Sequence, residues 1–164
     1  MMRKLALAIG GTLTLAACGS GNEGTIQTED GEIAYDIDQS GEETNVTITA
    51  EDGSTVVAQS GSGTADFPDG FSLYPGATVV SSMVINANDG AGSMITVQSS
   101  ATPEELAAHY RREAEAAGIT ISMNATVNGS VMINGEGPNG RTFSFSASPN
   151  GDETSGQLIV GMGG

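Results

Sequence analysis

Basic and aromatic side chains are scarce in this sequence. Five Lys and Arg residues face 20 Asp and Glu, for a formal net charge of −15, and aromatic residues make up 4% of the 164 positions. The charge argues against nucleic acid as a partner and against direct adsorption to anionic lipid. The few aromatics, together with 24 Gly, are typical of short strands and turns rather than of a helical bundle. The length predicts one domain, or one domain with a small appendage.

Long apolar runs are also absent. The uncharged stretch at residues 5–17 follows Arg3 and Lys4. It would form a helix of about 20 Å, whereas the hydrocarbon core of a bilayer is ~30 Å thick. A positive start, a short apolar run and small residues before Cys18 predict a signal peptide over residues 1–17.

The end of this signal resembles the lipobox of bacterial lipoproteins, in the string Leu15-Ala16-Ala17-Cys18. The resemblance implies that the Cys18 thiol receives a diacylglyceryl group and that a signal peptidase cuts between Ala17 and Cys18. The new amine is then acylated, for example with palmitate. Two or three acyl chains hold a protein stably at a membrane. We therefore expect a lipoprotein whose membrane partner is reached through the covalent lipid on Cys18, its only thiol.

The residue after Cys18 indicates the membrane in which the lipid would be anchored. Gly19 stands there rather than Asp, which resembles the enterobacterial pattern for release to the outer membrane. We expect an outer-membrane location facing the periplasm. The alternative is a plain secretory peptide with an incidental Cys18.

The mature chain divides into four predicted segments: a flexible tether (18–24), an acidic β-meander (25–58), a Gly/Ser linker (59–66) and an α+β domain (67–164). In the meander Ile33, Tyr35 and Ile37 alternate with polar residues, which places the apolar set on one face. A unit this small without disulfide or metal rarely folds alone. We expect it to lean on the following domain, on a copy of itself or on a partner.

The α+β domain contains one predicted helix, over residues 103–117. Thr102 is its predicted N-cap, Glu105 completes a capping box, and Gly118 follows its end. Strand patterns give the order β-β-α-β-β-β-β, hence a mainly antiparallel sheet with the helix on one face. The last strand, at residues 157–162, is expected to offer a free edge for strand addition by a partner.

Residues 67–127 resemble a module of uncharacterised bacterial envelope lipoproteins. The resemblance rests on the string Tyr74-Pro75-Gly76-Ala77 and on the helix start Thr102-Pro103-Glu104-Glu105. It implies an α+β periplasmic module and carries no activity or catalytic residue.

No catalytic constellation stands out in the sequence. His109, the only imidazole, is expected on the solvated helix face between Glu105 and Glu113, and a role as general base is the lesser alternative. A Gly-x-Ser-x-Gly elbow, the usual signal of a serine hydrolase, is absent. The Met residues of the mature chain are expected to fill the core rather than to form a peptide-binding surface. They are Met83, Met94, Met123, Met132 and Met162.

The acidic residues Asp30, Glu32, Asp36 and Asp38 have oxygen ligands suited to Ca²⁺. The spacing of a calcium-binding loop is missing, so we favour a solvated strand face and expect no metal or other cofactor. The sequence favours a non-catalytic, lipid-anchored envelope protein that serves as a protein-interaction or assembly module. The alternatives are a small-ligand or Ca²⁺-binding periplasmic module and, third, a hydrolase of envelope polymers.

Overall fold

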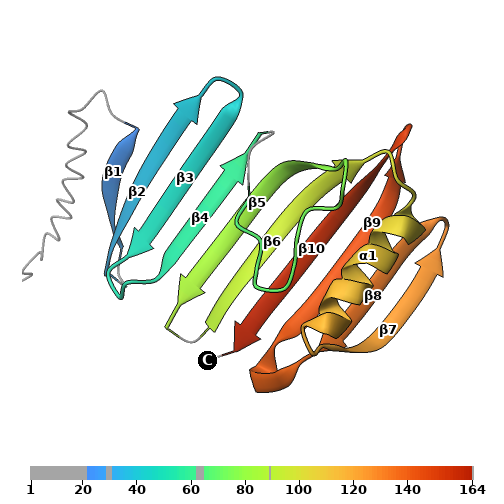
Figure 1. Cartoon of the computed structure of the whole chain (residues 1–164). Helices are drawn as coiled ribbons and strands as arrows, with labels where there is room; N and C mark the ends of the chain where they lie inside the picture. Colours follow the sequence, from blue (N-terminus) through green and yellow to red (C-terminus); the bar gives the residue numbers. More distant parts are fainter. Residues whose placement is uncertain (1–21, 29–30, 62–64, 89, 164) are drawn as a thin grey trace, which may run out of the picture.

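In the described part of the chain, ten strands form one antiparallel sheet, and the α-helix packs on one of its faces (Figure 1). The computed structural model describes residues 22–28, 31–61, 65–88 and 90–163. The strand order is β1-β2-β3-β4-β5-β6-β10-β9-β8-β7. The predicted fold class, with its order of two strands, helix and four strands after the meander, is confirmed. The strands are β1 (Glu23–Thr28), β2 (Gly31–Ser40), β3 (Glu43–Ala50), β4 (Thr55–Ser60), β5 (Thr78–Ala87), β6 (Gly90–Ser99), β7 (Thr120–Val127), β8 (Ser130–Glu136), β9 (Thr142–Asn150) and β10 (Glu153–Gly163).

Helix α1 (Pro103–Ala116) begins at the predicted capping box. The Thr102 hydroxyl accepts a hydrogen bond from the Glu105 backbone N–H at 3.3 Å, and the Glu105 carboxylate accepts one from the Thr102 N–H at 2.9 Å. These bonds satisfy two backbone donors that an uncapped helix leaves free. Gly118, with φ of +81°, follows the last turn in the left-handed region that Gly adopts without strain.

The helix buries its apolar face on the C-terminal half of the sheet, where Figure 1 shows it lying across β8 and β9. Leu106 and Tyr110 are fully buried there, and the Tyr110 ring lies 4.5 Å from the Phe145 ring. Burial of each such side chain stabilises the fold by about 1.5–3 kcal/mol. The other large residues buried completely in this half of the sheet are Ile95, Val97, Ile133 and Leu158.

The loop at residues 65–77 covers the part of the same face that the helix leaves open. Phe71 stacks on Phe143 at 5.6 Å, and Phe67 packs against the buried pair Ile95 and Val97. The helix and this loop therefore share one side of the sheet, which we call the helix side.

Strand β10 lies in the interior of the sheet, between β6 and β9. The expectation of a free edge at residues 157–162 is therefore wrong. Leu158 pairs with Ile95 on one side and with Phe145 on the other, because the hairpins from β7 to β10 bring the last strand back against β6. The edges of the described sheet are β1 and β7.

The meander extends the same sheet, because β4 pairs with β5 along its whole length. Strand β1 starts at Glu23 and β4 continues to Ser60. Every described residue of β1–β4 is half-buried or exposed, so these strands join the domain through their edge and contribute no fully buried core. Within the described part of the chain, no helix combines the length and the apolar character needed to cross a membrane.

Candidate functional site

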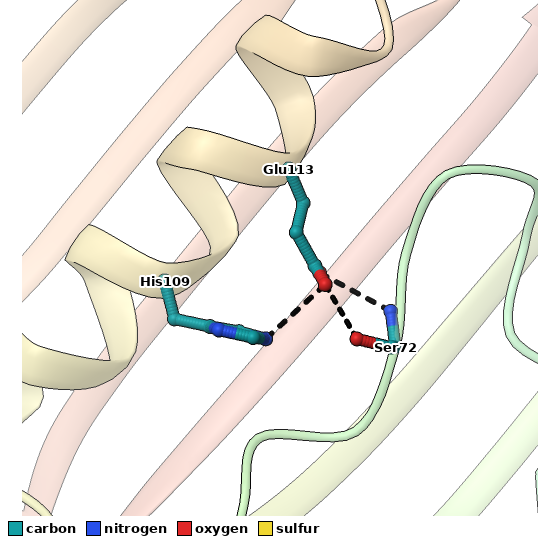
Figure 2. A network of polar contacts seen from close by, with 3 residues as sticks. All are labelled: Ser72, His109 and Glu113. Carbon is teal, nitrogen blue, oxygen red and sulfur yellow. Dashed lines mark hydrogen bonds and ion pairs between the residues drawn. The ribbon is translucent and has the colours of Figure 1, made fainter.

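A polar cluster joins the helix to the loop at residues 65–77 (Figure 2). The Glu113 carboxylate accepts hydrogen bonds from the Ser72 hydroxyl and from the Ser72 backbone N–H, the latter at 3.1 Å. The same carboxylate lies 3.4 Å from His109 Nε2, which makes an ion pair when the imidazole is protonated. The cluster ties the loop that carries Phe71 to the outer face of the helix.

The expectation that His109 lies on a solvated face is wrong. Its side chain is 15% exposed, and the rings of Tyr74 and Tyr110 meet it edge-on at 5.2 and 5.0 Å. The reason is that the loop folds over this helix turn and brings Tyr74 with it. Glu105, the other acidic neighbour in the sequence, is occupied by the capping box.

The order of groups in this cluster does not activate a nucleophile. In a serine hydrolase the serine hydroxyl donates to the imidazole, which the acid orients from its far side. Here the carboxylate stands between the other two groups, and the Ser72 hydroxyl donates to Glu113 rather than to His109. The arrangement holds two elements together and offers no general base to the serine.

Tyr110 lies behind His109, in the core. Burial raises the pKa of Tyr110 to about 12, while the nearby Tyr74 backbone opposes this shift and the charge of Glu113 adds to it. The Tyr110 hydroxyl has no hydrogen-bond partner of ordinary geometry among the described residues. A phenol with so high a pKa stays protonated at neutral pH and is a poor proton acceptor.

A shallow groove of about 300 Å³ lies beside the loop, on the helix side of β5, β6 and β10. Arg141 lies at its edge, donates to the Asp69 carbonyl and sits over the Phe71 ring at 5.6 Å. Apolar side chains, including Val84 and Val160, line the rest. The groove has the mixed lining of a small-ligand site but little depth.

The opposite face of the sheet carries an apolar surface without cover. Met94 directly precedes the core residue Ile95, and Ile159 directly follows the core residue Leu158. Because side chains alternate along a strand, Met94 and Ile159 point away from the helix. Met94 and Ile159 belong to a row of apolar residues that are paired across neighbouring strands, and this row ends at Ile37. We call the whole set the open-face patch. Its members are Ile33, Tyr35, Ile37, Val46, Ile48, Val56, Ala58, Met83, Ile85, Met94 and Ile159.

Two cross-strand rows make up most of the patch. One row reads Ile37, Val46, Ala58, Met83, Met94 and Ile159, with each residue paired directly to the next. The other reads Tyr35, Ile48, Val56 and Ile85. Five of the patch residues are 36–42% exposed, which is high for side chains of this size. They are Ile48, Met83, Ile85, Met94 and Ile159.

Charge is segregated from the open-face patch. The acidic side chains within β1–β3 alternate with its residues and so point to the helix side. They are Glu23, Glu32, Asp36, Asp38 and Glu43. Strands β4–β6 contain no charged residue, and β9 bounds the patch with the polar side chains of Ser144 and Ser146. The surface is uncharged on a strongly acidic chain.

The prediction that the Met residues fill the core is wrong. All five that the structure describes are 36–52% exposed, and four of them, Met83, Met94, Met123 and Met132, lie on the open face. The strand alternation was recognised correctly, but the helix and the loop cover only the other side. Met side chains adapt to varied partners, and they are common on interaction surfaces.

The remaining predicted positions divide as follows. Ala17 and Cys18, the expected cleavage and lipid-attachment site, and Asp30 lie outside the described residues. Asp36 and Asp38 lie on the same face of β2, which is on the helix side of the sheet. Among the described residues, no group of three or more His, Cys, Asp or Glu side chains converges as a metal site would. Sequence reasoning did not find the Ser72–Glu113 contact, which joins residues 41 positions apart and has no local signal.

Residues 79–156 match a family model described as START domain-like. The match runs from β5 to β10 and encloses α1. It overlaps the segment 67–127 and leaves out the meander. No curated protein and no solved structure matches the chain.

Proposed function

We propose that this chain is a lipid-anchored, non-catalytic protein of the bacterial envelope whose open-face patch is a protein-interaction surface. The observation that carries the proposal is an uncharged apolar face that spans six strands, β2 to β6 and β10, on a chain of net charge −15. Soluble monomers rarely expose apolar surface contiguously over several hundred Å². The acidic residues keep the rest of the surface hydrated, which leaves this face as the place for a partner.

The sequence supports an anchor close to this face. Only four residues separate Cys18 from β1, which starts at Glu23, and four residues span at most about 15 Å. A lipid on Cys18 would keep β1–β4 near the membrane, which we propose is the outer membrane on its periplasmic side. The patch would then lie within reach of other envelope proteins.

The polar cluster supports a non-catalytic role. Its serine is hydrogen-bonded to the carboxylate that also contacts the imidazole, and its phenol is held in the core. The cluster accounts for the positions of Ser72, His109 and Glu113 as contacts between loop and helix.

Two experiments test the proposal. The intact mass of the protein purified from its own membranes should equal residues 18–164 plus acyl groups, and Cys18→Ser should release the chain from the membrane fraction. A photo-crosslinking amino acid at Met83, in the patch, should give protein adducts in growing cells. The same group at Thr49, on the helix side, is the matched control. Equal adducts at both positions, or none at Met83, would refute the interaction surface.

The groove beside Arg141 supports one alternative, a small-ligand module. Val84 lines the groove and directly follows Met83, which points to the other face. Val84→Phe would fill the groove and leave the patch intact. If Val84→Phe abolished a function that Met83→Glu left unchanged, the ligand-binding interpretation would replace the interaction surface.

A further inference from the structure

We infer that the open-face patch packs face to face against the same patch of a second copy of this chain, so that the two sheets form a sandwich. The inference rests on the proposed function and names the partner of the same surface. In the meander, none of the described residues of β1–β4 is fully buried. A single-layer sheet needs a covered apolar face to be stable in water, and the following domain joins the meander at its edge, through the β4–β5 pairing and a hydrogen bond from Asn88 to Asp52.

The charge distribution favours a second copy. Two chains of net charge −15 repel each other, so they can associate only through a face that keeps acidic groups away from the contact. The open face does so, because Glu32, Asp36 and Asp38 on β2 point to the helix side. In a face-to-face pair, the acidic faces of both copies would lie outside, in water.

The shape of the surface also fits its own copy. Sheets with the same right-handed twist pack in an aligned sandwich about 10 Å apart, with alternate residues of each strand pointing inward. The two rows from Ile37 and from Tyr35 supply that alternation over at least four strands. Met83 and Met94, paired near the centre, are flexible enough to interdigitate with a second pair.

The area suits a weak dimer. Strands about 4.8 Å apart and side chains repeating about every 6.6 Å along each strand give each residue about 32 Å² of the face, so the eleven patch residues cover about 350 Å² per copy. The two copies together would bury about 700 Å², which is the size of a weak, transient interface. We therefore expect a dimer with a dissociation constant in the upper micromolar range.

A membrane surface is the other occupant that an anchored protein could meet, and the composition disfavours it. Residues 19–110 contain no Lys or Arg, whereas faces that lie on membranes usually pair their apolar residues with basic ones.

Sedimentation equilibrium of residues 19–164, which include every described residue, tests the inference. The wild-type chain should change from monomer to dimer as its concentration rises through the micromolar range. Ile48→Glu, which places a charge in the patch, should weaken the dimer at least tenfold. Thr49→Glu adds the same charge to the next residue of β3 on the helix side and should leave the dimer unchanged. A wild-type monomer at several hundred micromolar, or equal weakening by both variants, would overturn the inference.

Crosslinking in cells provides a readout that does not depend on the folding of Ile48→Glu. With the photo-crosslinker at Met83 of the full chain, an adduct of twice the mass that contains peptides of this chain alone supports the second copy. Adducts with a different envelope protein overturn the second copy but keep the interaction surface. Adducts with lipid alone overturn both proposals.

Discussion

The contact between Ser72 and Glu113 should hold the loop at residues 65–77 on the helix. Ser72→Ala removes the hydroxyl donor and keeps the backbone N–H that also reaches the carboxylate. A hydrogen bond to a charged group contributes about 1.5–3 kcal/mol. The Glu113 side chain is 19% exposed, so we take a value below that range, about 1 kcal/mol. Glu113→Ala also loses the backbone bond and the His109 contact, and it should cost about 2 kcal/mol.

The assay is a double-mutant cycle from urea unfolding followed by far-UV circular dichroism. We expect a coupling energy of about 1 kcal/mol between the two positions, because the hydroxyl bond is lost in both single variants and can be lost only once. Glu115→Ala, an exposed acid on the same helix, is the control and should change stability by less than about 0.5 kcal/mol. A coupling energy below about 0.3 kcal/mol would show that the contact does not stabilise the loop.

Three further predictions concern the cap, the buried phenol and the core. Thr102→Ala should cost about 1 kcal/mol. The Thr102 backbone N–H and, second, its hydroxyl lower the pKa of Glu105 from 4.5; because Ala loses only the hydroxyl, part of the stability gap in urea unfolding should disappear as the pH falls below 4.5, and a constant gap would contradict this. Because the pKa of Tyr110 is raised in the folded chain, the wild-type free energy of unfolding should fall as the pH rises from 10 towards 12. Tyr110→Phe should remove this pH dependence, and an unchanged dependence would refute its assignment to Tyr110. Gly156→Ala would place a methyl 3.1 Å from Phe145 Cζ and should cost about 1–3 kcal/mol in thermal unfolding, whereas an unchanged melting temperature would mean that the core has room.

Local signals in the sequence predicted the local structure well. The capping box and the end of the helix at Gly118 both depend on residues a few positions apart, and the structure confirms both. A tight hairpin turn at Asn128 and Gly129, with φ values of +51° and +78°, has the same local character. The alternation in β2 also placed Ile33, Tyr35 and Ile37 on one face correctly.

Long-range relations account for what the sequence did not predict. The position of β10 depends on its pairing with β6, about 60 residues earlier in the chain, and hairpin signals contain no information on that choice. The environment of His109 depends on Tyr74, which reaches it from the loop. Period-two patterns show that Met83 and Met94 share a face, but only the placement of the helix decides which face is covered.

The two halves of the sheet place their apolar residues on opposite sides, and this reversal links the fold to the proposed function. In β6 and β8–β10 the fully buried apolar residues point to the helix side, where α1 and the loop cover Phe145 and Leu158. In β2–β4 the apolar residues apart from Ala34 and Val57 point to the open face, where the described chain has no covering element. One sheet with a single covering layer can bury only one of these sets. A one-residue slip of β2–β4 that turned Val46 and Ile48 to the helix side would turn Asp36 and Asp38 to the open face. The sequence thus keeps the acidic residues out of the open face throughout the meander, which a surface meant for water alone would not require.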